Sequence, residues 1–205
     1  MSRHPLSRRL MSRRRRAQGD DGTALIEAAF VLPILVIMVF GIIEVGFLYR
    51  SASVATGASR AGARLASQTL AYGGTGGTYP SQATTVAAIA STVATELKAR
   101  GSTDTPQTMY LYKANANGYP GTQTDFSSCS SNCFTFTWNA GTSTWNTAAG
   151  SWSSPDACGQ VIDSVGVYVL MKHTAFVAPR SLSVSTVSQS TVMRFEPRQN
   201  CTSVE

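Results

Sequence analysis

Histidine and acidic residues are scarce in this chain of 205 residues, and their scarcity limits the chemistry that it can perform. His4 and His173 are the only histidines, and His4 lies in an arginine-rich leader. A Ser-His or Cys-His catalytic pair would therefore depend on His173 alone. Asp156, Asp163 and Glu196 form no recognisable acid–base pair. The sequence thus predicts no enzyme and no cofactor. A membrane-anchored hydrolase that uses His173 remains an alternative, and mutation of His173 would test it.

Charge is absent from the run between Ala28 and Ile43, which Glu27 and Glu44 border. A helix over residues 25–49 would be roughly 37 Å long, enough to cross a hydrocarbon core of about 30 Å. An unpaired carboxylate in the middle of a bilayer costs several kcal/mol. We therefore expect each glutamate to lie near an interface, to be neutralised or to have a partner.

Positive charge is concentrated ahead of this apolar run. Residues 1–21 hold seven arginines and two aspartates, so they contribute 7 − 2 = +5 of the formal charge of +6. By the positive-inside rule this end stays in the cytoplasm, and the chain after Arg50 lies outside it. The membrane segment accounts for the arginines, so nucleic acid is not expected as a partner. These features predict a single-pass inner-membrane protein with an extracytoplasmic domain.

Two short blocks within the apolar run carry a more specific pattern. The block Gly22–Glu27 (GTALIE) places a glycine five residues before a glutamate, and the block Gly41–Gly46 (GIIEVG) follows Pro33. Together they resemble the TadE-like family of minor pilins and pilus-assembly proteins of the tight-adherence (Tad, Flp-type) type IV pilus system. The resemblance extends over about residues 19–68.

This resemblance implies a maturation step and a set of partners. A prepilin peptidase would cut between Gly22 and Thr23, and Glu27 would become the fifth residue of the mature chain. Glu27 would then neutralise the new amine of Thr23 on a neighbouring subunit during assembly. The implied partners are the membrane, the prepilin peptidase, other pilins and Tad assembly proteins. The implied roles are pilus biogenesis and adhesion, either within the surface pilus or in the assembly machinery.

Other interpretations of the N-terminal region stay open. The apolar run could be an uncleaved signal anchor, or a secretory signal cleaved near Ser51–Ser53. The protein could also be a signal-anchored extracytoplasmic binding or adhesion module that does not polymerise. Co-purification with pilus components and the N-terminal residue of the mature chain would distinguish these possibilities.

The region after the apolar run predicts two helices. The first continues through residues 50–68, where small residues recur at a spacing of four and would let another helix approach closely. The second covers Thr84–Arg100, and Gly101 is placed to end it. Its apolar positions recur at helical spacing and form one stripe: Val86, Ile89, Ala90, Val93 and Leu97.

The rest of the extracytoplasmic region predicts an antiparallel sheet. Strands are expected at Thr108–Tyr112, Phe134–Trp138, Thr144–Trp145, Val161–Lys172 and Leu182–Phe195, with a bulge near Thr186. Residues 118–132 and 147–159 are expected to be surface loops. The sequence therefore predicts an α+β, pilin-like fold, divided into a leader (1–22), a transmembrane and extended helix (23–70) and an extracytoplasmic domain (71–205).

The cysteines all lie in the predicted extracytoplasmic part: Cys129, Cys133, Cys158 and Cys201. An even number in that location favours disulfides, and four cysteines allow three connectivities. We favour a local Cys129–Cys133 link and a Cys158–Cys201 link that holds the C-terminus. A zinc site is the less favoured alternative, because Cys129 and Cys133 have no second closely spaced pair to complete it.

Overall fold

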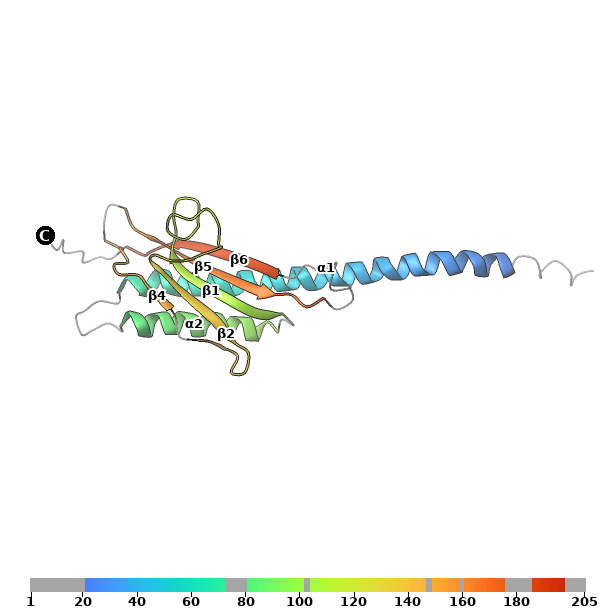
Figure 1. The fold of residues 1–205 in the computed structure, drawn as a ribbon, viewed down its shortest axis with the longest axis horizontal. Coiled ribbons are helices and arrows are strands. Elements are labelled where there is room, and N and C mark those ends of the chain that lie inside the picture. Colours follow the sequence, from blue (N-terminus) through green and yellow to red (C-terminus); the bar gives the residue numbers. More distant parts are fainter. Residues whose placement is uncertain are drawn as a thin grey trace, which may run out of the picture. The chain divides into compact units, whose positions relative to one another are not determined.

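The computed structural model describes residues 21–72, 81–101, 104–146, 149–158, 161–175 and 186–197. Contacts divide the chain into two compact units, residues 1–43 and 44–205. The predicted leader lies almost wholly outside the described residues. The second unit holds a helical layer packed on a sheet (Figure 1).

Two helices account for all the predicted helical sequence. Helix α1 runs from Asp21 to Thr69 without a break at Pro33, and a 3₁₀ turn, η1 (Leu70–Tyr72), follows it. Helix α2 covers Gln82–Ala99. The Ser81 hydroxyl accepts the Thr84 backbone N–H at its start, and Gly101 ends it in the left-handed region, with a φ of 58°.

The two helices meet through small residues, as the sequence predicts. A Cβ added to Gly62 would lie 2.5 Å from a Val93 methyl of α2 and 3.5 Å from Val167 of the sheet. Only glycine therefore permits this approach. The apolar stripe of α2 is buried throughout, and α1 contributes small buried residues: Val54, Ala55, Ala58, Ala63 and Ala66.

The strands form one antiparallel sheet in the order β3-β2-β1-β5-β6, with β4 paired to β2 (Figure 1). Their bounds are β1 Thr105–Lys113, β2 Cys133–Asn139, β3 Thr144–Trp145, β4 Ala149–Ser151, β5 Ser164–Lys172 and β6 Thr186–Arg194. The two helices cover one face, and the sheet's core side chains point toward them: Met109, Leu111, Phe134, Phe136, Val165, Val167, Val169 and Met171. The predicted α+β class is confirmed.

The segment 114–132 covers part of the opposite face. Phe126 stacks on Tyr168 with ring centroids 4.3 Å apart and planes 7° apart, and it meets Tyr112 edge-on. Tyr112 donates its hydroxyl to the Gly118 carbonyl at 2.9 Å. The predicted surface loop is therefore a compact cover over an aromatic sheet face.

Two strand predictions need correction. Strand β5 begins at Ser164 rather than Val161, and Val161 is 80% exposed and unpaired with β1. Strand β4 lies in a stretch predicted as loop, since its Ala-Gly-Ser sequence carries no strand signal. A register shift that was not predicted lies in β1 between Pro106 and Thr108. Strand β6 pairs in regular register from Thr186 on; residues 182–185, which suggested a bulge, lie outside the described residues, so that bulge stays a prediction.

Candidate functional site

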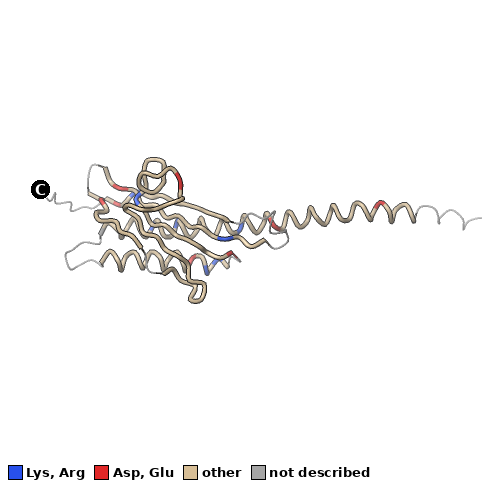
Figure 2. Tube along the Cα trace, in the orientation of Figure 1, with Lys and Arg blue, Asp and Glu red and all other residues tan. Residues whose placement is uncertain are grey.

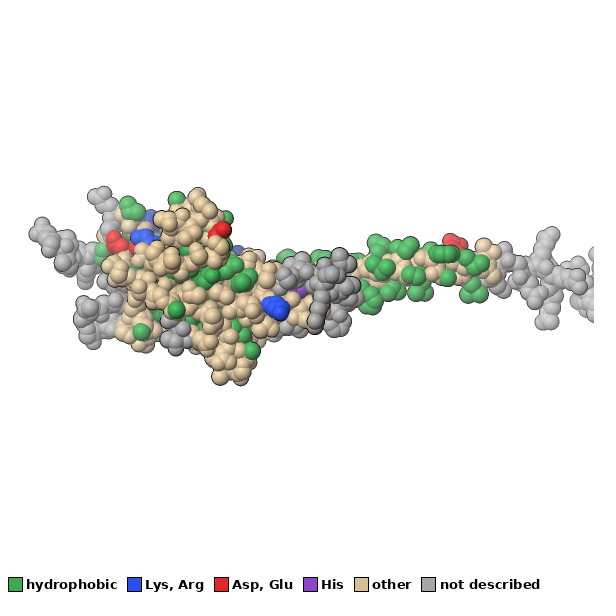
Figure 3. All heavy atoms as spheres, viewed as in Figure 1, with side chains coloured by type: hydrophobic (Ala, Val, Ile, Leu, Met, Phe, Trp, Pro, Cys, Tyr) green, Lys and Arg blue, Asp and Glu red, His purple; other side chains and the backbone are tan. Residues whose placement is uncertain are grey.

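The first part of α1 exposes a continuous apolar surface (Figure 3). Large side chains from Leu25 to Ile43 face outward, and an 18-residue window has a mean hydropathy of 2.7 with none of it buried. Figure 2 shows how few charged residues this segment carries. By length and composition the helix can cross a membrane, and a soluble protein rarely exposes so large an apolar surface.

The predicted processing and assembly residues lie at the start of this segment. Gly22 and Thr23 belong to the first turn of α1, and no other atom lies within 4 Å of the position that a Gly22 Cβ would take. Thr23 and Glu27 are both exposed. The Gly22–Thr23 bond is thus uncovered within the described part of the chain. Cleavage there and the role of Glu27 remain predictions.

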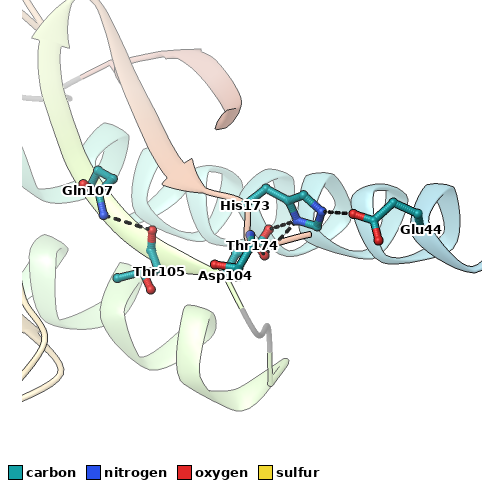
Figure 4. A network of polar contacts seen from close by, with 6 residues as sticks. All are labelled: Glu44, Asp104, Thr105, Gln107, His173 and Thr174. Carbon is teal, nitrogen blue, oxygen red and sulfur yellow. Dashed lines mark hydrogen bonds and ion pairs between the residues drawn. The ribbon is translucent and has the colours of Figure 1, made fainter. Parts of the chain in front are cut away.

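Glu44, the second glutamate of the apolar run, belongs to a buried polar cluster (Figure 4). His173 follows β5 directly, and its Nε2 lies 2.9 Å from the Glu44 Oε1. Its Nδ1 lies 2.9 and 3.1 Å from the two carboxylate oxygens of Asp104, which precedes β1. The Thr174 backbone N–H also donates to Asp104, at 3.4 Å. The cluster thus joins a helix to the ends of two strands.

Burial gives these contacts their strength. The side chains of Asp104, His173 and Glu44 are 0%, 1% and 13% exposed. Burial alone would lower the pKa of His173, but hydrogen bonds and charge from Glu44 and Asp104 outweigh it and raise that pKa above its ordinary value. These contacts favour the protonated ring. The ring is a partner for Glu44, which is one of the three outcomes expected from the sequence.

The sequence identified only part of this cluster. It expected Glu44 to lie near an interface, to be neutralised or to have a partner, and the structure shows a partner in the buried His173. Asp104 was missed because a lone aspartate in a stretch of polar residues carries no motif. The sequence did offer one indication of the cluster. A charged residue in an apolar run needs compensation, and only one histidine follows the leader.

Arg50 ties α1 to the end of α2. Its guanidinium donates to the backbone carbonyls of Arg100, at 3.2 Å, and Gly101, at 2.9 Å. The last carbonyls of a helix lack intrahelical partners and carry negative partial charge, so a cation there is stabilising. The Arg100 side chain in turn covers Gly57 and pairs with Glu96 at 3.3 Å.

The cysteine predictions are resolved in part. Cys129 and Cys133 form a disulfide, with Cα atoms 5.8 Å apart, and it attaches the end of the covering segment to β2. No free cysteine occurs in the described part of the chain. Cys201 lies outside that part, so its pairing with Cys158 remains a prediction. Among the described residues, no group of His, Cys, Asp and Glu side chains is arranged to hold a metal ion.

The other acidic residues considered for chemistry have structural partners. The Lys113 ammonium lies 2.6 Å from the Asp163 carboxylate, which also accepts the Asp156 backbone N–H at 3.2 Å. Glu196 accepts the Gln68 amide at 3.1 Å. The Lys113 contact joins the end of β1 to the chain before β5, and the Glu196 contact joins the chain after β6 to α1; neither brings an acid–base pair toward His173.

Comparison with protein families gives one match. The family model described as TadE-like protein matches residues 22–64 of the 205. Comparison with curated proteins and with solved structures gives no match. The matched segment contains the exposed apolar part of α1, with Glu27 and Glu44, and the turns of α1 that pack on α2. The chain therefore carries a TadE-like segment over residues 22–64, which confirms the resemblance found in its sequence.

Proposed function

We propose that this protein is a membrane-anchored component of a Tad pilus, acting as a minor pilin or as part of the assembly machinery. The TadE-like match over residues 22–64, on a helix with an exposed apolar surface, carries this proposal. The helix would cross the inner membrane with the arginine-rich end in the cytoplasm. The α+β domain would then face the outside, where its cysteines can form disulfides.

Processing by a prepilin peptidase is part of the same proposal. The uncovered Gly22–Thr23 bond is the expected cleavage point, and the cut would remove the basic leader. A new α-amine would then stand at Thr23, a few residues from Glu27. A carboxylate in this apolar setting is costly unless a cation neutralises it. We propose that the Thr23 amine of a neighbouring subunit neutralises Glu27 during assembly.

Adhesion would follow from incorporation into, or assembly of, the pilus. A structural role for the domain is supported by ion pairs within the fold, in which Asp163 meets Lys113 and both Glu44 and Asp104 meet His173. The partners under this proposal are the peptidase, other pilins and Tad assembly proteins.

A matched pair of glutamate variants tests the proposal. Glu27→Ala should leave membrane insertion intact and abolish both surface piliation and co-purification with pilus components. Glu96→Ala removes an exposed carboxylate from α2 and should leave piliation normal. Membrane fractionation of both variants controls for insertion. Normal piliation in the Glu27→Ala strain would defeat the proposed mechanism. Absence of pilus components from the wild-type complex would favour the non-polymerising module.

A further inference from the structure

The buried cluster at Glu44 has a geometry that requires a proton. Both ring nitrogens of His173 face carboxylate oxygens, Nε2 toward Glu44 and Nδ1 toward Asp104. A neutral imidazole carries one N–H and one lone pair, whereas the imidazolium donates from both nitrogens. With both carboxylates ionised, only the imidazolium can make the two contacts at once. A neutral ring would direct a lone pair at one of the carboxylates.

We infer that Glu44, Asp104 and His173 form a proton-dependent latch that fastens α1, at the end of its apolar run, to the sheet. The three residues come from parts of the chain 69 and 129 positions apart, so the contact is purely tertiary. It joins the turn of α1 at Glu44 to the chain just before β1 and just after β5 (Figure 4). Loss of the proton would remove one of the two N–H donors and direct a ring lone pair at a carboxylate oxygen.

The described cations near the cluster do not replace the imidazolium. Arg50 on α1 is engaged with the carbonyls at the end of α2. Lys98 on α2 and Lys172 on β5 are both exposed, so water and salt weaken their influence. His173 is therefore the cation of the described residues that touches both carboxylates.

The direction of the response follows from these contacts. The pKa of His173 is raised, because the two carboxylates outweigh the effect of burial. The latch is consequently closed below the raised pKa, and it opens as the pH rises through that pKa. Loss of the proton removes the positive charge of His173 and turns one ring lone pair toward a carboxylate oxygen. The end of β5 and the turn of α1 at Glu44 would then separate.

Two measurements on the full chain in nanodiscs test the latch. The first is an NMR titration of the His173 ring. Its pKa should lie above the ordinary value of about 6.5, and Glu44→Gln should shift it downward. Glu96→Gln makes the same change at an exposed site on α2 and should leave it in place. A wild-type pKa at or below the ordinary value, or no shift in Glu44→Gln, would overturn the inference.

The second measurement follows the distance across the latch. Spin labels at Val45→Cys on α1 and Lys172→Cys on β5 occupy exposed positions on its two sides. The distance distribution should be narrow below the His173 pKa and broaden above it. His173→Gln should give a distribution that does not change with pH. A wild-type distribution that stays narrow while His173 loses its proton would show that the contact does not depend on the proton.

Discussion

The contact between α1 and α2 at Gly62 makes the most quantitative prediction. In Gly62→Ala, the new methyl would lie 2.5 Å from a Val93 methyl, whereas carbon atoms pack best at about 3.5–4.0 Å. The helices must therefore separate by about 1 Å at this point, or Val93 must leave its position. Tight packing opposes both movements, because Val93 and Ala63, the residue that follows Gly62, are fully buried. The substitution should destabilise the extracytoplasmic domain.

The expected cost combines two opposing effects. Overpacking a core costs about 1–3 kcal/mol, and the better helix propensity of alanine returns up to about 1 kcal/mol. The difference spans about 0–3 kcal/mol, and an approach as close as 2.5 Å places the expected net loss at about 1–2 kcal/mol. This loss is equivalent to a melting temperature roughly 2–8 °C lower for a chain of this size. Urea unfolding of the full chain in detergent, followed by tryptophan fluorescence, measures this loss.

Two further variants make the test specific. Gly46→Ala adds a methyl to the same helix where nothing it could meet lies within 4 Å, so the domain should lose no stability and can gain up to about 1 kcal/mol from helix propensity. Adding Val93→Ala to Gly62→Ala should restore space, and the two changes should cost less together than the sum of their separate costs. Strict additivity, or an unchanged stability in Gly62→Ala, would refute the close helix contact.

Two other predictions concern the sheet and the polar cluster. Phe126→Ala removes the ring stacked on Tyr168 and should lower the free energy of unfolding by about 2–3 kcal/mol in a urea titration. Val161→Ala changes an exposed residue and should leave the free energy of unfolding unchanged. Equal effects of the two variants would argue against the aromatic cover. The raised pKa of His173 predicts that stability is greatest below the ordinary value of about 6.5 and falls as the pH rises through the folded-state pKa. His173→Gln should flatten this pH dependence in thermal unfolding, and an unaltered profile would contradict it.

Periodic elements were predictable from the sequence, and contacts between distant residues were not. The stripe of α2 and the alternation of β5 depend on local spacing, which the sequence displays directly. The small residues that recur within residues 50–68 were predicted to let another helix approach. The contact of Gly62 with Val93 became known only from the structure.

The errors have physical causes of the same kind. Strand β4 forms because β2 offers a free edge, and its own Ala-Gly-Ser sequence has little preference for strand. The covering segment 114–132 is held by the stacking of Phe126 and by a disulfide, and both depend on tertiary placement. The polar cluster combines Glu44, Asp104 and His173, whose separations in sequence fit no motif. Isolated residues of this type become a site only when the fold brings them together.

The proposed function depends most directly on the state of the N-terminus. The decisive measurement is the intact mass and N-terminal residue of the protein isolated from its native membrane. The proposed function predicts a mature chain that begins at Thr23 and lacks the basic leader. A chain that begins at Met1 or Ser2 would contradict prepilin-type processing and leave an anchored module. A start just beyond Ser51 would make the domain a secreted protein and remove the proposed role of Glu27.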